Sequence, residues 1–146
     1  MTFCEQVRTV AVVSGNRTTI ETVWVRLMGS GKHCVLELYR ASAQKLNDEA
    51  FIRDALAEAA RVSHATLIDI RTHPFTPQGV TGFALLAESH ISIHTWPEHG
   101  YAAVDVFTCG ERTDPELACL FLAETFEAAS KHILTLDRYL PDLIQV

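Results

Sequence analysis

The sequence lacks the long apolar run that a membrane span or a secretion signal needs. Within residues 1–30, charged side chains interrupt every apolar stretch well short of a spanning length. Basic residues are also scarce, since 12 Lys and Arg stand against 18 Asp and Glu and leave a net charge of −6. Such a chain has no general basic surface that could neutralise phosphates. We therefore expect a cytoplasmic protein with no membrane partner and no nucleic-acid partner.

Cysteine pairs at metal-binding or redox spacing are absent as well. The four cysteines, Cys4, Cys34, Cys109 and Cys119, lie far apart and form no C-x-x-C motif. What the chain does have is apolar surface, because 48% of its 146 residues are hydrophobic and 21% are charged. That is sufficient for one folded domain and excludes a disordered or low-complexity protein.

The acidic excess is unevenly distributed along the chain. Residues 1–88 carry nine basic and nine acidic side chains, whereas residues 89–146 carry three basic and nine acidic ones. The whole net charge of −6 therefore belongs to the last 58 residues. Composition alone does not explain this boundary.

Apolar patterns and turn signals predict the order strand, helix, strand, strand, strand, strand, helix, strand, after an N-terminal hairpin. The hairpin strands are expected at 9–13 and 22–27, the later strands at 34–39, 65–71, 82–87, 90–96, 101–108 and 133–140. This order favours an α+β fold, a two-layer sandwich with an antiparallel β-sheet and two helices on one face. We expect residues 1–30 to be an N-terminal extension of unknown role and residues 31–146 to form the domain.

The two helices have start signals in the sequence. Asn47 is positioned to cap the first helix. Thr113 and Glu116 have the spacing of a capping box for the second helix, which should run to about Lys131. Between the helices, the proline-containing segment 72–80 is expected to form a loop.

Potential metal ligands are concentrated between residues 72 and 112, where four of the seven histidines lie. A site could combine three histidines with an acid or a thiol: His90, His94 and His99, with Glu98 or Cys109. In a regular strand His90 and His94 share a face. The spacing nevertheless matches no established zinc pattern, so no metal ligand is assigned and a histidine-rich metal-binding module stays an alternative.

Taken singly, the other notable side chains in this segment have ordinary interpretations. No G-x-S-x-G motif surrounds Ser89, and a lone Cys109 is typical of a small buried apolar residue. Phe75 and Trp96 fit a role in core packing. A specific function therefore depends on the longer pattern in which these residues occur.

That pattern resembles a known signature. Residues 85–110, LLAESHISIHTWPEHGYAAVDVFTCG, are similar to the active-site segment of the prokaryotic S-adenosylmethionine decarboxylase proenzymes. The resemblance covers about residues 31–140 and includes the segments 31–33, 45–48 and 77–82. Residues 1–30 lie outside it.

The resemblance implies that the chain modifies itself. The Ser89 hydroxyl would attack the carbonyl of Glu88, and β-elimination of the resulting ester would leave a beta chain (1–88) and an alpha chain (89–146) that begins with a pyruvoyl group. The family's proton acceptor in processing corresponds to His94, and its supporting hydroxyl to Thr81. Because Ser89 and His94 would lie on opposite faces of a regular strand, we expect a bend or bulge between them.

The resemblance also implies the activity of the processed chain. This is the decarboxylation of S-adenosylmethionine to S-adenosylmethioninamine, the aminopropyl donor for spermidine. The pyruvoyl cofactor would form a Schiff base with the substrate amine and withdraw electrons from it. A thiol is largely protonated at neutral pH, so Cys109 suits the implied role of proton donor to carbon. Phe75 and Trp96 would enclose the adenine, and Glu98 would bind the ribose hydroxyls.

A homodimer whose active sites contain residues of both protomers is implied as well. A sheet with helices on one face needs a cover for its other face. Two alternatives remain: a pyruvoyl-dependent arginine or ornithine decarboxylase of the same family, and the non-catalytic metal-binding module. The adenine-binding aromatics argue against the first alternative, because a small amino acid does not need them.

Overall fold

The computed structural model describes residues 5–14, 17–26 and 31–138 of the chain. Its contacts divide the chain into two units, residues 31–137 and the remainder. In the smaller unit, β1 (Glu5–Ser14) pairs antiparallel with β2 (Arg17–Arg26). This confirms the expected pairing of the two N-terminal stretches, whose central turn at 15–16 lies outside the described residues.

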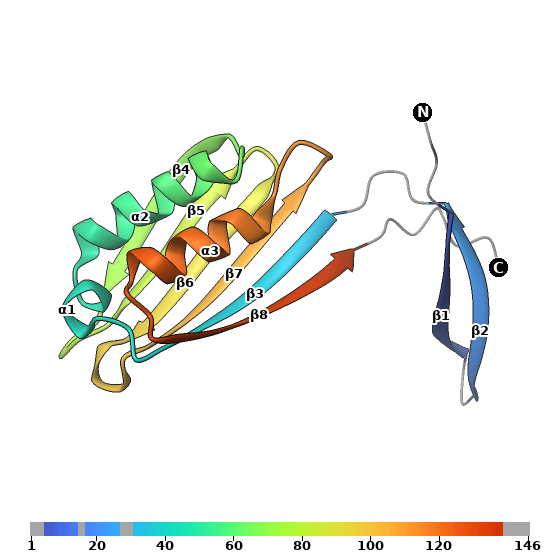
Figure 1. Cartoon of the computed structure of the whole chain (residues 1–146), viewed down its shortest axis with the longest axis horizontal. Coiled ribbons are helices and arrows are strands. Elements are labelled where there is room, and N and C mark those ends of the chain that lie inside the picture. Colours follow the sequence, from blue (N-terminus) through green and yellow to red (C-terminus); the bar gives the residue numbers. More distant parts are fainter. Residues whose placement is uncertain (1–4, 15–16, 27–30, 139–146) are drawn as a thin grey trace. The chain divides into compact units, whose positions relative to one another are not determined.

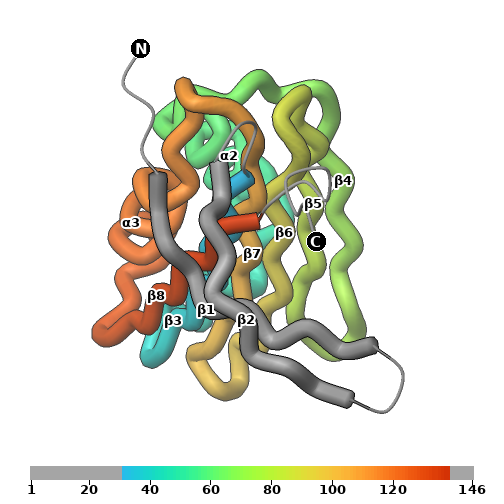
Figure 2. The backbone as a smooth tube through the Cα atoms, turned by 90° about the vertical axis from the view of Figure 1, so that its right-hand side faces the viewer, coloured from blue at the N-terminus to red at the C-terminus, as the bar shows by residue number. Residues whose placement is uncertain are grey.

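The larger unit is built on a six-stranded antiparallel sheet in the order β4-β5-β6-β7-β3-β8 (Figure 1). Its strands are β3 (Gly31–Tyr39), β4 (Leu67–Pro74), β5 (Val80–Leu86), β6 (Ser89–Trp96), β7 (Tyr101–Cys109) and β8 (Ser130–Arg138). Figure 2 shows β4, β5, β6 and β7 side by side. No helix in the described part of the chain is long and apolar enough to span a membrane.

Two helices cover one face of this sheet. Helix α2 (Glu49–Val62) lies along β4 and β5, and α3 (Pro115–Thr125) lies along β3 and β7 (Figure 1). Two single turns, α1 (Ala43–Leu46) and η1 (Pro97–His99), complete the helical segments. The expected α+β sandwich is therefore confirmed.

The core lies between the helices and the sheet. It is formed by alternate residues of the strands and by one stripe of each helix. Its largest fully buried side chains include Leu36, Leu38, Ile52, Leu56, Ile91, Ile93, Val104, Val106, Leu122 and Phe126. Because the strand residues between them point the other way, this packing fixes which side chains reach the opposite face of the sheet.

The first helix cap differs from the prediction. The side chain of Asp48, and not that of Asn47, accepts a hydrogen bond from the Phe51 N–H at 3.0 Å and caps α2. The turn α1, which the sequence pattern did not indicate, ends just before Asn47 and moves the start of α2 by one residue. The Asn47 side chain instead accepts a hydrogen bond from the Gly79 N–H at 2.9 Å.

The second helix also differs at both ends. Asp114 caps α3 through the Glu116 N–H at 3.0 Å, while the Thr113 hydroxyl is directed to the Cys109 carbonyl at 3.3 Å. The helix ends at Thr125 and does not reach Lys131, which belongs to β8. The left-handed backbone that follows at Glu127, with φ 55, turns the chain into that strand.

The segment expected as a loop from 72 begins later than predicted. Strand β4 continues to Pro74, because His73 and Pro74 still pair with Thr81 and Val80 of β5. The connection therefore spans only residues 75–79. This extension brings Phe75 to the end of the sheet.

The face of the sheet opposite the helices, which we call the open face, is covered by no helix in the described residues. Large apolar side chains on it are exposed, including Phe83 at 40%, Leu85 at 42% and Leu136 at 43%. Between them lie polar and ionisable side chains: His90, Ser92, His94, Asp105 and Cys109. An apolar surface of this extent, interrupted by functional groups, is typical of an interaction or ligand-binding surface.

Candidate active site

The candidate site residues lie at the two ends of β6. The strand pairs without a register shift with β5 from Ser89 to His94 and with β7 from Ser89 to Trp96, so the bend expected between Ser89 and His94 is wrong. Five residues of a strand span about 16 Å. We call Glu88, Ser89 and Cys109 the turn group. We call Phe75, Thr81, His94, Trp96 and Glu98 the aromatic group.

The turn group is built on a tight hairpin between β5 and β6. Leu86 pairs with Ser89, which leaves only Ala87 and Glu88 in the turn. Ser89 adopts φ 146, a region that residues with a side chain rarely occupy and that costs about 1–3 kcal/mol. The backbone strain is therefore located at the Glu88–Ser89 junction itself, and not at a bulge within the strand.

Hydrogen bonds hold Glu88, the residue on the N-terminal side of this junction, through its carbonyl and through its carboxylate. The Glu88 carbonyl oxygen accepts the Cys109 backbone N–H at 3.0 Å. The Glu88 carboxylate accepts the backbone N–H of Thr66 at 2.8 Å and the Thr66 hydroxyl at 3.1 Å. These bonds, the one from the Thr66 backbone first, keep the pKa of the Glu88 carboxyl below its ordinary value. The carbonyl is thus polarised by a fixed donor in a fixed orientation.

The Ser89 hydroxyl has a close neighbour that our reading of the sequence did not include among the processing residues. Its Oγ lies 3.1 Å from Nδ1 of His90. The ring of His90 stacks on Phe83, with centroids 5.4 Å apart and planes inclined by 17°. The sequence could have indicated His90 because it directly follows Ser89. In a regular strand, however, the side chains of neighbouring residues point to opposite faces, so no contact between the two was expected.

The aromatic group lies at the other end of β5 and β6. Thr81 and His94 are directly opposite each other in the antiparallel register, and Thr81 Oγ1 lies 2.8 Å from His94 Nδ1. The Trp96 ring packs against Tyr101, with centroids 5.2 Å apart. Phe75 and Trp96 are nevertheless 53% and 39% exposed. A cavity of about 320 Å³ is lined by Phe75, Gln78, Thr81, His94, Thr95, Trp96 and Glu98.

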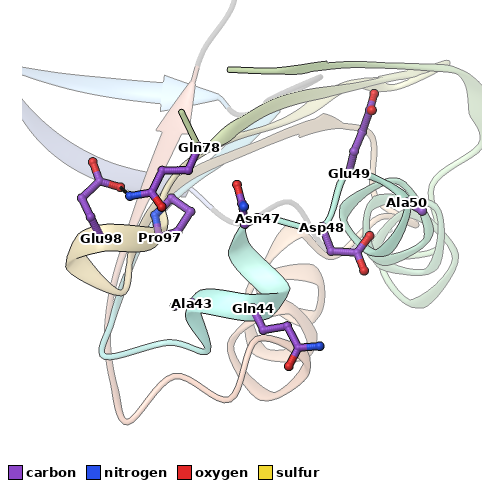
Figure 3. A pocket seen from close by; sticks show the side chains of 9 residues that line it. All are labelled: Ala43, Gln44, Asn47, Asp48, Glu49, Ala50, Gln78, Pro97 and Glu98. Atoms are coloured by element: carbon purple, nitrogen blue, oxygen red, sulfur yellow. Dashed lines mark hydrogen bonds between the residues drawn. The ribbon is translucent and has the colours of Figure 1, made fainter. Parts of the chain in front are cut away.

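Gln78 positions the acid of this group. Its side-chain N–H donates to Glu98 Oε2 at 3.1 Å, and Figure 3 shows the two side chains pointing toward each other. The same two residues also line the neighbouring depression formed with α1 and the start of α2. Gln78 was not among our candidate residues, because a lone glutamine in a loop carries no distinctive signal.

Asn47 holds the loop from which Phe75 and Gln78 project. The hydrogen bond from the Gly79 N–H to its side chain is matched by one from the Phe75 N–H to the Gly79 carbonyl at 2.8 Å. Gly79 has φ 97, and a Cβ there would lie 2.9 Å from the Thr95 carbonyl oxygen, so only glycine fits. These contacts therefore fix the conformation of the loop at residues 75–79.

The geometry gives the metal alternative no support. Within residues 5–14, 17–26 and 31–138, no three His, Cys, Asp or Glu side chains lie close enough to hold a metal ion. His90 and His94 do share the open face. However, His90 contacts Ser89 and Phe83, whereas His94 contacts Thr81.

Comparisons of the chain with known proteins all identify the same family. The chain matches the family described as S-adenosylmethionine decarboxylase over residues 32–139. It is 57% identical over 114 residues to the S-adenosylmethionine decarboxylase proenzyme of Prochlorococcus marinus. This match covers 78% of this chain and 93% of that protein. The corresponding proenzyme of Methanococcus aeolicus is 51% identical over 108 residues, 74% of this chain and 92% of that protein.

A solved structure is similar in fold. The crystal structure of the adenosylmethionine decarboxylase from Aquifex aeolicus VF5 superimposes with a TM-score of 0.70 at 37% sequence identity. The match covers 75% of this chain and 91% of that one.

Proposed function

The chain belongs to the S-adenosylmethionine decarboxylase family, and on this premise we propose that it is a proenzyme that cleaves itself between Glu88 and Ser89 and then decarboxylates S-adenosylmethionine. The observation that carries this proposal is the junction itself. Ser89 is strained at φ 146, and the Glu88 carbonyl is held by the Cys109 N–H. The names of the relatives favour this substrate over arginine or ornithine.

Self-cleavage begins with attack of Ser89 Oγ on the carbonyl carbon of Glu88. The carbonyl electrons move to oxygen, where the Cys109 N–H at 3.0 Å stabilises the negative charge. The Glu88–Ser89 C–N bond then breaks, which relieves the backbone strain and leaves an ester. Removal of the Ser89 α-proton and breakage of the Cβ–Oγ bond then release the main-chain carboxylate of Glu88, which becomes the new C-terminus of the first fragment. Water then displaces the nitrogen as ammonia, and the new terminus at residue 89 is a pyruvoyl group.

The residues at the turn fit this group. Ser89, its precursor, starts β6 directly beside the end of β7, where Cys109 is exposed. Once formed at residue 89, a pyruvoyl group would supply the electron-withdrawing ketone that decarboxylation requires. The Cys109 thiol then supplies the proton that the substrate's α-carbon needs.

The aromatic group binds the substrate's nucleoside. Phe75 and Trp96 offer exposed rings on which adenine can stack, each contributing about 0.5–1.5 kcal/mol beyond the area that it buries. Glu98, oriented by Gln78, accepts hydrogen bonds from the ribose hydroxyls. Rings at this position also favour the positive sulfonium.

One protomer does not bring the two groups together, and a homodimer does. His94 is separated from Ser89 by about 16 Å along a straight strand, so it cannot serve as the proton acceptor of its own turn group. A two-fold axis that lies between two open faces and runs across the strands places the turn group of one protomer opposite the partner's aromatic group. Two sheets packed in this way lie about 10 Å apart. The pairing creates two identical sites and covers the exposed apolar side chains.

The remaining parts of the proposal concern the rest of the chain and the product. Residues 31–146 form the enzyme, processed into chains 1–88 and 89–146, and residues 1–30 are an extension to which we assign no role. The decarboxylated product serves as the aminopropyl donor for spermidine. The reaction takes place in the cytoplasm.

The test combines intact-mass measurement with a substrate assay. The purified protein should yield two fragments, 1–88 and 89–146, the second beginning with a ketone and not with an amine. CO₂ should be released from carboxyl-labelled S-adenosylmethionine and not from labelled arginine or ornithine. A chain that stays intact would contradict the processing, and CO₂ from a basic amino acid would contradict the substrate.

A further inference from the structure

We propose that His90 is a catalytic residue of self-cleavage, whose Nδ1 accepts the Ser89 hydroxyl proton as Ser89 attacks Glu88. The inference rests on the proposed function and adds a residue to it. It gives each protomer its own base for the first step.

The contact arises from the unusual backbone at the turn. The side chains of two successive strand residues normally point to opposite faces and do not meet. At Ser89, φ 146 changes the direction of the side chain, and Oγ lies 3.1 Å from Nδ1 of His90. The same strain that marks the junction therefore also brings the nucleophile to a base.

Neighbouring side chains hold the imidazole in place. Its ring stacks on Phe83 of β5 at 5.4 Å and meets the edge of Phe107 of β7 at 6.2 Å. The charged groups nearest to it are His33 of β3 and Asp105 of β7, which contact each other at 3.2 Å. A ring clamped in this way keeps Nδ1 directed at the hydroxyl and loses little freedom during the reaction.

The surroundings also favour the neutral imidazole, which is the form that can accept a proton. Burial, followed by the nearby His33, lowers the pKa of His90, while Asp105 acts in the opposite direction. With the ring proton on Nε2, Nδ1 carries a lone pair toward Ser89. The protonation of His90 therefore depends on its burial and on the two nearby groups, His33 and Asp105.

The first step then balances within one protomer. The Oγ–H proton moves to His90 Nδ1 as the Oγ–C bond to Glu88 forms. It returns to the Ser89 nitrogen as the Glu88–Ser89 C–N bond breaks, so His90 is neutral again when the ester is complete. The partner's aromatic group is left with the second step, removal of the Ser89 α-proton, for which its histidine is available. His94 of one protomer and His90 of the other would thus act in succession at one site.

Three variants separate the two steps. His90→Phe keeps an aromatic ring against Phe83 but removes the acceptor. His90→Asn keeps an acceptor oxygen near the position of Nδ1. His132 is an exposed histidine on β8, and its variant His132→Phe is the matched control. Each is purified as the full chain, and cleavage is followed by mass spectrometry with and without hydroxylamine, which cuts esters.

We expect His90→Phe to slow cleavage about 100-fold, as is typical for loss of a general base. Treatment of this variant with hydroxylamine should release no fragment, because no ester accumulates. His90→Asn should cleave at an intermediate rate, and His132→Phe at the wild-type rate. The acid limb of the wild-type rate should lie below the ordinary histidine range near 6.5 and should disappear in His90→Asn. His94→Ala, in contrast, should accumulate an ester that hydroxylamine cuts.

Two results would overturn the inference. One is wild-type cleavage by His90→Phe; the other is a hydroxylamine-sensitive ester in either His90 variant, which would place His90 in the elimination. If His90→Phe does not fold, as judged by circular dichroism, the rate and pH profile of His90→Asn decide in the same way. A wild-type chain that is never cut would instead refute the proposed function.

Discussion

The two ends of the open face differ in how their residues are held. At the turn group the backbone carries the chemistry: a strained φ at Ser89 and a carbonyl fixed by the Cys109 N–H. At the aromatic group the side chains carry the proposed binding role: Phe75 and Trp96 are 53% and 39% exposed, and Gln78 holds Glu98. Bond breaking needs a rigid, hydrogen-bonded peptide, whereas binding needs accessible surface. In the proposed function, the separation of these two requirements along β6 gives each protomer two half-sites.

The largest expected effect comes from removing the nucleophile of the turn group. Ser89→Ala should abolish cleavage and, with it, all decarboxylation, because the pyruvoyl group cannot form. Ser92→Ala is a matched control on the same strand, since the Ser92 hydroxyl makes a long contact of 3.5 Å with Asp105. Mass spectrometry and CO₂ release measure both outcomes. Residual cleavage at residue 89 in Ser89→Ala would show that the turn group has been assigned wrongly.

Next in size is the effect of keeping the two open faces apart. Leu85→Glu places a charge on the open face, so we expect monomers in sedimentation, with cleavage and activity both reduced at least 100-fold because neither half-site is completed. Leu120→Glu is the matched control, because Leu120 on α3 is equally exposed at 42%. A monomeric Leu85→Glu chain that still cuts itself at the normal rate would argue against a shared site.

Variants of the aromatic group should separate binding from cleavage. Trp96→Ala and Phe75→Ala each remove one ring, and we expect KM for S-adenosylmethionine to rise about tenfold, which corresponds to about 1.4 kcal/mol. Cleavage at Glu88–Ser89 should continue at the wild-type rate, because neither ring takes part in the proton transfers of cleavage. Slow cleavage with an unchanged KM would reverse the roles of the two groups.

The smallest effect is expected from the support of the substrate loop. Asn47→Ala removes the acceptor of the Gly79 N–H, a bond worth about 0.5–1.5 kcal/mol, and should raise KM a few-fold without slowing cleavage. Asn47→Asp keeps an acceptor oxygen and should stay close to wild type. Steady-state kinetics and the rate of fragment formation check both. An equal rise in KM for the two variants would mean that the hydrogen bond does not position the loop.

The arrangement of strands could be predicted from the sequence because each buried strand alternates, as Leu36, Ile91 and Val104 do with their neighbours. The predicted cap of α2 is one residue early because no local pattern indicates the turn α1 before Asp48. The predicted cap of α3 is also one residue early, because the Thr113 hydroxyl is directed to the Cys109 carbonyl and Asp114 caps the helix. Contacts between distant segments, such as Asn47 with Gly79, depend on the fold and leave no trace in spacing. The odd separation of Ser89 and His94 in the sequence predicts a bend within the strand, whereas β6 pairs without a register shift and the unusual backbone lies at Ser89.

The most direct test of the shared site uses mixed dimers. A tagged Ser89→Ala chain is expressed together with an untagged His94→Ala chain, and dimers containing both are isolated through the tag. We predict that the His94→Ala chain, which stays uncut by itself, is cleaved between Glu88 and Ser89 in the mixed dimer, because its partner supplies an intact His94. A His94→Ala chain that remains intact in purified mixed dimers would contradict the account.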